Sequence, residues 1–369
     1  MQELFNMESN LYSVFLGTGS YIPTQQVSNA DFLTHQFYDT TGEKFKVSNE
    51  EIVEKFEKIT GIRERRYVTD DLVTSDIAFM AATEAILSSG IDKESIDCII
   101  VAHNFGDVKA DNRRSDIVPS IASRVKYKLK IVNSAVCYDI CFGCPGWLQA
   151  VILADSFLKS GQIKRALVIG AETLSRVSDP HDRDSMIYAD GAGAVIMGAI
   201  ESSKPIGIIS NSCRSDTLEQ TYYLRMGKSY NPNYSGNELF LKMDGRKLYE
   251  YALDIVPQAI KSTIDKIGLS INDVSKVLLH QANHKMDMAI LKRLFQLYDK
   301  KEVPEAIMPM IIYRLGNSSV ATLPTLYNLL LTKQVDDQSK VANCKSGDTL
   351  VFASVGAGMN VNAVIYRLP

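Results

Sequence analysis

The sequence lacks any marked excess of charge, because 40 lysine and arginine residues stand against 43 aspartate and glutamate residues in a chain of 369. It also lacks a block of like charges, so we expect no nucleic-acid partner and no membrane-surface partner. The nearest candidate is 63–66 (RERR), which contains an acid and no interleaved aromatic residue. That composition is more typical of a solvated surface with a local role.

Long apolar runs are missing as well, since none approaches the roughly 18 residues that a membrane span needs. Residues 1–19 show no basic segment followed by an apolar one, so we predict no signal peptide. We therefore expect a cytoplasmic protein whose thiols stay reduced. With 46% hydrophobic and 22% charged residues, the chain has the composition of a globular protein with a large core.

No low-complexity stretch or Pro/Ser-rich linker divides the chain. Strand-like apolar runs alternate instead with helical periodicity, which is typical of an α/β fold. The predicted strands are 12–18, 97–102, 134–140, 165–171, 192–199, 205–211, 275–280, 307–313, 349–355 and 360–367. The predicted helices are 75–89, 119–129, 145–160, 246–267, 283–297 and 319–332.

Internal similarity indicates a duplication. Residues 85–104 align with 263–282, and each segment reads as a helix ended by glycine, a short loop and a buried strand. Further along, the Ser-Gly pair before ALVIGA recurs before TLVFAS. We therefore expect two pseudo-equivalent α/β halves, 1–202 and 203–369, that share one core.

Three of the six cysteines fall within eight residues, in the segment CYDICFGCPGW. Pro145 suits the first turn of a helix, which places Cys144 at the N-cap, beside unpaired amides and the positive end of the helix dipole. That setting predicts a lowered thiol pKa. Gly143 and Gly146 allow a tight turn and close approach of a substrate.

Three interpretations of Cys144 remain open at this point. It could be one of several small buried hydrophobic residues, as the other cysteines are expected to be. Alternatively, Cys141 and Cys144 could form a redox Cys-x-x-Cys pair. A zinc site is less favoured, because no second Cys/His pair has ligand spacing. Finally, Cys144 could be a nucleophile, which requires a histidine and a polar partner from elsewhere in the chain.

His280 and Asn317 are the candidate partners, because α/β sheets place reactive groups at strand ends and helix starts. His280 ends a predicted strand, although such histidines are often hydrogen-bonded core residues. His284 follows at i+4, but position 281 is Gln and the glutamate of a zinc motif is absent. Asn317 precedes a helix and could equally be a turn residue. The bend at 356–358 could turn a backbone N–H towards the same site.

Taken in order, these segments resemble the β-ketoacyl-acyl-carrier-protein synthase III family of thiolase-fold condensing enzymes. The resemblance covers nearly the whole chain. It rests on 17–23 (GTGSYIP), 60–65 (TGIRER), the cysteine turn, 190–194 (DGAGA), 280–283 (HQAN), 316–319 (GNSS) and 356–358 (GAG).

The resemblance implies a thiolase-like α/β fold, with two βαβαβαββ halves in a five-layered αβαβα core. It implies a catalytic Cys-His-Asn triad of Cys144, His280 and Asn317, with an oxyanion hole made by the N–H groups of Cys144 and Ala357. It implies no cofactor and no metal, since coenzyme A or phosphopantetheine thioesters are the substrates.

Substrate and partner residues also follow from the resemblance. Arg183 matches an arginine that lies against the adenine of coenzyme A in the family, whereas the usual tryptophan partner is replaced by Lys55. The other residues expected in substrate binding are Asn283, Val118 and Phe142. An acyl carrier protein is the implied partner, with Lys285, Lys292 and Arg293 as candidate docking residues, and the chain is expected to form a homodimer.

The predicted reaction is decarboxylative Claisen condensation of an acyl thioester with a malonyl thioester, as in the initiation of fatty-acid synthesis. The segment 104–118 is longer and more polar than the family's loop, and 214–240 is long and Tyr-rich, so both suggest a pocket reshaped for a different acyl chain. The alternatives are therefore a related ketosynthase of secondary metabolism, making a resorcinol, cyclohexanedione or long-chain ketone precursor, or acyl transfer without decarboxylation.

Overall fold

The computed structural model describes residues 10–336, 341 and 343–369 of the chain. Its first sheet has five strands in the order β1-β7-β6-β4-β5. Their bounds are β1 Asn10–Tyr21, β4 Cys98–Ala102, β5 Val136–Ile140, β6 Arg165–Thr173 and β7 Asp190–Ser202. The strand β4 runs parallel to both β5 and β6, whereas β7 is antiparallel to β6 and β1.

The second sheet has four strands in the order β11-β12-β13-β8. Their bounds are β8 Gly207–Ser215, β11 Lys276–Leu279, β12 Thr349–Gly356 and β13 Asn360–Arg367. Here β11 and β12 are parallel, and β13 is antiparallel to β12 and β8. The parallel strands of the two sheets therefore direct the segments that follow them towards one region.

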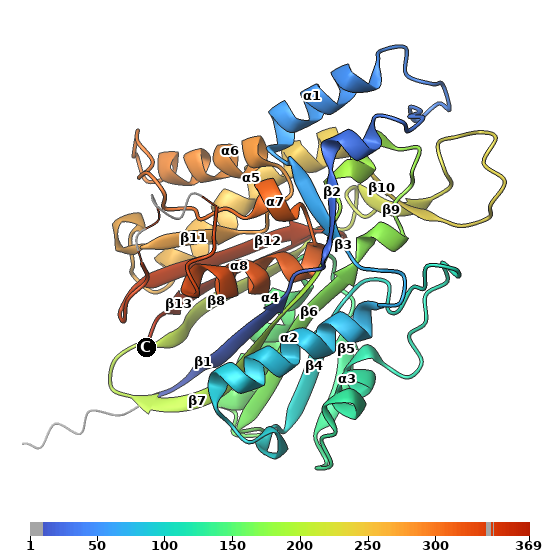
Figure 1. Ribbon diagram of the computed structural model, residues 1–369. Coiled ribbons are helices and arrows are strands. Elements are labelled where there is room, and N and C mark those ends of the chain that lie inside the picture. Colours follow the sequence, from blue (N-terminus) through green and yellow to red (C-terminus); the bar gives the residue numbers. More distant parts are fainter. Residues whose placement is uncertain (1–9, 337–340, 342) are drawn as a thin grey trace, which may run out of the picture.

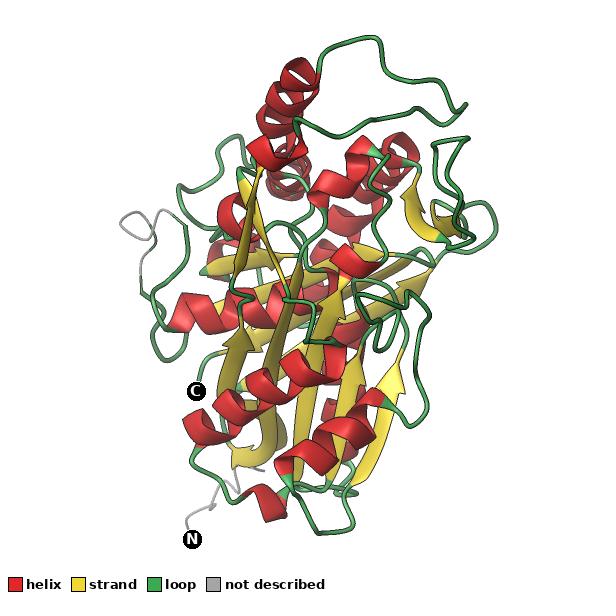
Figure 2. Ribbon diagram, turned by 45° about the vertical axis from the view of Figure 1, so that its right-hand side comes forward, coloured by secondary structure: helices red, strands yellow, loops and turns green. Residues whose placement is uncertain are grey.

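Helices separate and cover the two sheets, which gives five layers in the order αβαβα (Figures 1 and 2). The outer face of the first sheet carries α2 (Thr74–Ser89) and α3 (Ile121–Leu129). Between the sheets lie α4 (Gly146–Lys159) and α8 (Thr322–Leu331). The outer face of the second sheet carries α5 (Gly245–Asp265) and α6 (His284–Gln296). The thiolase-like fold expected from the resemblance is thus confirmed.

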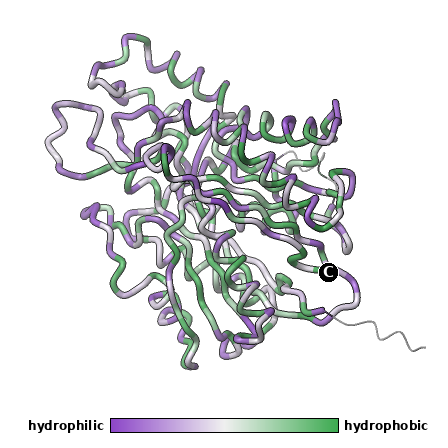
Figure 3. The backbone as a smooth tube through the Cα atoms, turned by 180° about the vertical axis from the view of Figure 1, so that it is seen from behind, coloured by the Kyte–Doolittle hydropathy of each residue, from purple (hydrophilic) through white to green (hydrophobic). Residues whose placement is uncertain are grey.

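Burial on both faces explains why the strands read as continuous apolar runs rather than alternating ones. Every residue of β4 and β12 is buried. Figure 3 shows hydrophobic positions along the strands and hydrophilic ones on the outer loops. The helices of the middle layer are deeply buried, because nine of the ten residues of α8 and most of α4 lie out of contact with solvent between the sheets.

Smaller elements surround this core. They are α1 (Asn49–Thr60), α7 (Ile312–Leu315), β2 (Gln25–Ser28), β3 (Glu64–Tyr67), β9 (Leu224–Gly227) and β10 (Phe240–Met243), with short 3-10 helices at 29–32, 93–95, 174–176, 183–187, 271–273 and 319–321. The strands β2 and β3 pair with each other, as do β9 and β10.

One predicted strand is wrong. Residues 307–313 form no strand, and α7 begins within that range at Ile312. Pro309 lacks the N–H that a sheet ladder requires. The side chain of Gln281 takes over the local pairing, because its Nε2 donates to the Pro309 carbonyl (2.8 Å) and its Oε1 accepts from the Ile311 and Ile312 N–H groups (2.9 and 3.1 Å).

The other predicted strands and helices are found with small changes of their ends. The predicted helix 319–332 starts as a 3-10 turn before α8. The first sheet is drawn from residues 10–202 and the second from 207–367, whereas the division of the chain at residue 202 into equivalent halves stays a prediction. Within the described residues, no helix combines the length and apolarity needed to cross a membrane.

Candidate active site

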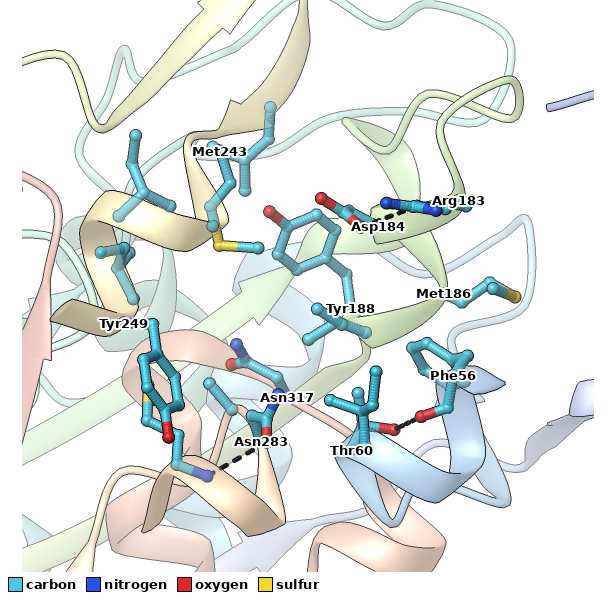
Figure 4. Close-up of a pocket in the computed structure, with 18 of the residues that line it drawn as sticks. Phe56, Thr60, Arg183, Asp184, Met186, Tyr188, Met243, Tyr249, Asn283 and Asn317 are labelled. Carbon is cyan, nitrogen blue, oxygen red and sulfur yellow. Dashed lines mark hydrogen bonds and ion pairs between the residues drawn. The ribbon is translucent and has the colours of Figure 1, made fainter. Parts of the chain in front are cut away.

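A cavity of about 490 Å³ brings together the thiol, imidazole and amide that the sequence singled out, Cys144, His280 and Asn317. Figure 4 shows part of its lining, including Asn317, Asn283 and Tyr188. Most of the wall is apolar, and it is drawn from α1, α5, α6, β9, β10 and the 3-10 turn at 183–187. Its apolar residues include Phe56, Leu174, Ile187, Leu224, Leu241, Met243 and Leu248.

Cys144 lies between the end of β5 and the start of α4, in a turn that closes on the 356–358 bend. Gly143 adopts a left-handed φ of 64°, and a Cβ there would lie 2.6 Å from the Ala357 nitrogen. A Cβ on Gly356 would lie 2.5 Å from the Cys144 nitrogen. Two glycines therefore let the backbone beside Ala357 approach the backbone of Cys144, as a shared oxyanion site requires.

The predicted low pKa of Cys144 is wrong in direction. The helix N-cap is Pro145 rather than Cys144, and α4 begins at Gly146. Burial of the thiol raises its pKa to about 11, and the hydrogen bond from Ser319 opposes that rise only in part. At neutral pH the sulfur therefore carries its proton, and nucleophilic attack requires a base to accept it.

His280 directly follows β11 and is held through its main chain, because its N–H donates to the Ala353 carbonyl (2.9 Å). The side chain is buried, and burial lowers its pKa to about 4. The ring is thus neutral near pH 7. Its Nδ1 has no hydrogen-bond partner within the described residues. A neutral, buried imidazole can accept a proton from a thiol or donate one hydrogen bond to a substrate oxygen.

Asn317 is positioned from the first sheet. Its N–H donates to the Ile187 carbonyl (3.0 Å), and its carbonyl accepts from the Ala189 N–H (2.8 Å), so Tyr188 and Asn317 form a parallel bridge. The side-chain Oδ1 accepts from the Ser319 N–H (2.8 Å). The amide NH₂ is therefore the part of Asn317 left to donate into the cavity.

A buried network of hydrogen bonds connects Glu172 to the sulfur of Cys144. The Glu172 carboxylate accepts from the N–H and Nδ2 of Asn104 (2.9 and 2.8 Å). Asn104 in turn accepts from the Gly143 N–H (3.0 Å) and donates to Ser319 Oγ (3.3 Å). Ser319 Oγ donates to Cys144 Sγ (3.4 Å). Burial raises the pKa of Glu172 to about 7.

The remaining predicted site residues divide into two groups. Arg183 and Asn283 line the cavity, Arg183 with its guanidinium 4.7 Å from the centre of the Phe45 ring. Asn283 also caps α6, because its Oδ1 accepts from the Met286 N–H (3.1 Å). The residues that do not line the cavity are Val118, Phe142, Lys285, Lys292 and Arg293. Of these, Val118 and the three basic residues are exposed.

Sequence reasoning missed Glu172, Asn104 and Tyr188 as members of the site. A signal existed for two of them, because Glu172 and Asn104 follow the apolar runs of predicted strands, where α/β sheets place reactive groups. Ser319 belonged to a quoted motif, but its contact with the sulfur depends on a left-handed φ of 54° that the sequence does not reveal.

The geometry also bears on the redox-pair and zinc-site interpretations of Cys141 and Cys144. Cys141 and Cys144 are both free thiols; Cys141 is exposed, whereas Cys144 is half-buried and lines the cavity. In the part of the chain that the structure describes, no three His, Cys, Asp or Glu side chains lie together as a metal site would need.

Family models of 3-oxoacyl-[acyl-carrier-protein] synthase III match residues 138–217, and those of its C-terminal part match residues 264–368. A curated relative, the β-ketoacyl-[acyl-carrier-protein] synthase III of Ehrlichia ruminantium, is 34% identical over 96% of this chain and 99% of its own length.

Solved structures agree with this assignment. The 3-oxoacyl-[acyl-carrier-protein] synthase III of Aquifex aeolicus is 28% identical, with a TM-score of 0.76 over 96% of this chain and 99% of that one. The priming β-ketosynthase of the R1128 polyketide pathway is 25% identical, with a TM-score of 0.78 over 100% and 99%. The chain belongs to the β-ketoacyl-[acyl-carrier-protein] synthase III family and is a ketosynthase-type condensing enzyme, a transferase.

Proposed function

We propose that the protein condenses an acyl thioester with a malonyl thioester by decarboxylation, through an acyl group carried on Cys144. The observation that carries the proposal is the convergence of Cys144, His280 and Asn317 on one cavity. Acyl transfer alone makes less demand on the histidine and asparagine, so their joint presence favours condensation.

In the first step the Cys144 sulfur attacks the acyl carbonyl. A new S–C bond forms, the thioester C–S bond to coenzyme A or phosphopantetheine breaks, and the thiol proton passes through His280 to the departing thiolate. Because the thiol pKa is raised to about 11, this proton transfer accompanies the attack rather than preceding it. The N–H groups of Cys144 and Ala357 stabilise the oxyanion.

In the second step a malonyl thioester takes the place of the first thiol. Neutral His280 and the Asn317 NH₂ donate hydrogen bonds to its thioester oxygen. The bond to the carboxylate breaks, carbon dioxide leaves, and the electron pair forms an enolate that these two donors stabilise. The enolate carbon then attacks the acyl carbonyl, the S–C bond to Cys144 breaks, and the Cys144 thiolate takes up a proton from solvent.

Initiation of fatty-acid synthesis is the role we assign first, since the 34% identical relative bears the corresponding name. A priming role in secondary metabolism is the second candidate. One support is the likeness to a priming ketosynthase over the entire chain. The other is that part of the cavity wall comes from β9, which lies within the long 214–240 segment, and from β10 and α5, which follow it. In either case coenzyme A or phosphopantetheine thioesters serve as substrates and no separate cofactor takes part.

An acyl carrier protein is the proposed macromolecular partner. Lys285, Lys292 and Arg293 are exposed on α6, whose first residues border the cavity through Asn283 and Met286. Basic side chains on a helix whose start borders the cavity suit an acidic carrier that delivers a thiol-linked arm. Arg183 and Lys55 line the same opening and suit the phosphates of coenzyme A.

We also propose a homodimer. The strand β5 lies at the edge of the first sheet (Figure 1), so no strand of the described residues pairs with its outer backbone groups. Large apolar side chains near this edge are exposed, namely Ile117, Val118, Tyr127, Val132 and Val136. A second copy would cover such a surface.

The test is intact-mass analysis after incubation with a panel of acyl-coenzyme A and acyl-carrier thioesters. Wild type and Cys141→Ala gain one acyl group, and Cys144→Ala gains none. Malonyl thioester then discharges the acyl group as product from wild type, but not from His280→Ala or Asn317→Ala. The proposal fails if no thioester acylates the protein, or if both of the latter variants condense at the wild-type rate.

A further inference from the structure

The Tyr188 hydroxyl is a buried polar group that the reaction above does not use. The residue is only 4% exposed, and its Oη has no hydrogen-bond partner in the described parts of the chain. Tyr188 lines the cavity together with Cys144 and Asn317. Figure 4 shows its ring extending among the lining residues, with the hydroxyl on the side of Met243.

The position of this side chain is fixed by the same main-chain bonds that hold Asn317. Tyr188 lies between the Ile187 carbonyl and the Ala189 N–H that pair with Asn317, and its own N–H donates to the Ser185 carbonyl (3.1 Å). Tyr188 and Ala189 are the two residues immediately before β7, which starts at Asp190. The Tyr188 side chain is thus held at the cavity wall by rigid elements rather than by a loose loop.

The surroundings of the hydroxyl make it a donor. Burial raises the pKa of Tyr188 well above 10, and nearby Asp182, Asp184, Cys144 and Tyr230 act in the same direction. The phenol therefore keeps its proton, while the neighbouring wall is largely leucine, isoleucine and methionine. A buried donor without an acceptor is uncommon in folded proteins, so a missing acceptor at this point is informative.

An acyl group on Cys144 would enter the cavity that Tyr188 also lines. We propose that Tyr188 donates a hydrogen bond to an oxygen on the acyl chain, so that the enzyme prefers acyl thioesters whose chain bears a keto or hydroxyl oxygen over plain alkyl chains. This inference rests on the proposed function, because it concerns the group transferred to Cys144.

The chemical basis is the asymmetry of hydrogen bonding in a buried site. A chain with an acceptor pairs with the hydroxyl, whereas an alkyl chain leaves the donor desolvated and unpaired. Sites that hydrogen-bond a substrate oxygen reject analogues without it more strongly than apolar pockets reject an extra methylene.

The experiment compares acylation rates for matched coenzyme A thioesters. The pairs are butanoyl with 3-hydroxybutanoyl and 3-oxobutanoyl, and hexanoyl with 4-oxohexanoyl and 5-oxohexanoyl. In wild type, at least one oxygenated chain reacts about tenfold faster than its alkyl match. In Tyr188→Phe that ratio falls to about one. Tyr249→Phe is the matched control, because Tyr249 lines the same cavity but is partly exposed, and it retains the wild-type ratio.

Loss of folding is not expected to obscure the result, because Tyr188→Phe removes a hydroxyl that has no hydrogen-bond partner among the described residues. Its melting temperature should equal or exceed that of wild type. The inference is overturned if wild type shows no preference for any oxygenated chain, or if the preference survives in Tyr188→Phe. It is also overturned if Tyr188→Phe slows all chains equally, because the acceptor would then lie on the pantetheine arm that they share. If no thioester of any kind acylates Cys144, the proposed function itself has failed.

Discussion

Ser319 donates a hydrogen bond from its Oγ to the sulfur of Cys144 at 3.4 Å. It is the hydrogen bond that most lowers the pKa of a thiol otherwise raised by burial. Ser319 also receives the Asn104 Nδ2 donor, so the hydroxyl lies within a chain of hydrogen bonds that ends at the sulfur. We expect the reactivity of Cys144 to depend on this contact.

Replacing Ser319 by Ala should raise the pKa of Cys144 and slow its alkylation by iodoacetamide by roughly fivefold at pH 8.5, because the thiolate loses one hydrogen bond. The measurement is the alkylation rate against pH, read by intact mass. Ser318→Ala is the control, since Ser318 Oγ contacts Thr322 instead. Equal rates for both variants would contradict the prediction.

Replacing Glu172 by Gln should have the opposite effect, because the Glu172 charge raises the pKa of the Cys144 thiol. Since Glu172 itself has a pKa of about 7, it is neutral below that pH and ionised above it. The variant should match wild type at pH 6 and be alkylated roughly three- to tenfold faster at pH 8.5.

The control for charge removal alone is Glu201→Gln, at an exposed position of β7. It should follow wild type at both pH values. A faster rate for Glu172→Gln at pH 6 as well would mean that repacking, not charge, is responsible.

His280 should stay neutral well below pH 6.5, because burial lowers its pKa to about 4. The chain has five histidines, so His280 can be assigned in an NMR titration by the peak lost in His280→Asn. That peak should not move between pH 7.5 and 5.5. A midpoint near 6.5 would show that the ring is solvated or paired.

The same shift makes a prediction about stability. A histidine whose folded pKa is depressed contributes stability that is present above pH 6.5 and lost as the pH falls towards 4. Between pH 7.5 and 5, wild type should therefore lose about 2 kcal/mol of unfolding free energy relative to His280→Asn. Urea denaturation at the two pH values measures this difference.

Substitution of Gly143 by Ala should slow acylation strongly, because a Cβ there meets the Ala357 nitrogen at 2.6 Å and displaces one side of the oxyanion site. Loss of one such donor slows related reactions about 100- to 1,000-fold. Gly90→Ala is a matched control, since Gly90 has a similar φ of 68° and nothing within 4 Å of the added Cβ.

Both glycine variants should be less stable by about 1–2 kcal/mol from backbone strain alone, and thermal melting measures it. Only Gly143→Ala should also show strongly slowed acylation. If acylation of Gly90→Ala is slowed as much, the effect comes from global destabilisation rather than from the contact with Ala357.

Charge reversal at Lys285 should raise the KM for malonyl-carrier protein about tenfold without changing the KM for malonyl-coenzyme A, because Lys285 is exposed outside the cavity. Steady-state kinetics at two salt concentrations measure the difference, which high salt should reduce. Lys164→Glu is the control, since Lys164 is exposed just before β6, at the opposite end of that strand from the site. A parallel rise for both donors would place Lys285 in the path of the thioester arm.

Periodicity and position along strands predicted most of the fold because both faces of each sheet are buried, which leaves long apolar runs in the sequence. The strand prediction for 307–313 was wrong for a non-local reason. Its apolar residues are buried, but Gln281, distant in the chain, satisfies the local backbone with its side chain. Apolar character alone does not separate such a segment from a strand.

The site was predictable to the extent that strand ends and helix starts reveal reactive groups. Cys144, His280 and Asn317 meet that rule and are brought together at one cavity. The thiol pKa was not predictable, because the N-cap position predicted for Cys144, which would lower it, is occupied by Pro145. Burial of the thiol, a tertiary property, raises the pKa instead. Tyr188 gave no signal either, since an unpaired hydroxyl can be recognised only when every neighbour is known.

The close contact of Gly143 with Ala357 joins the two sheets at the reaction centre itself, because these residues follow β5 of the first sheet and β12 of the second. A packed middle layer of α4 and α8 holds them again behind it. These contacts hold the two sheets together, so we do not expect the sheets to separate to admit a bulky donor. A substrate has to reach the sulfur end-on, by threading a slender chain through the cavity, which suits acyl groups presented at the tip of a long linear arm.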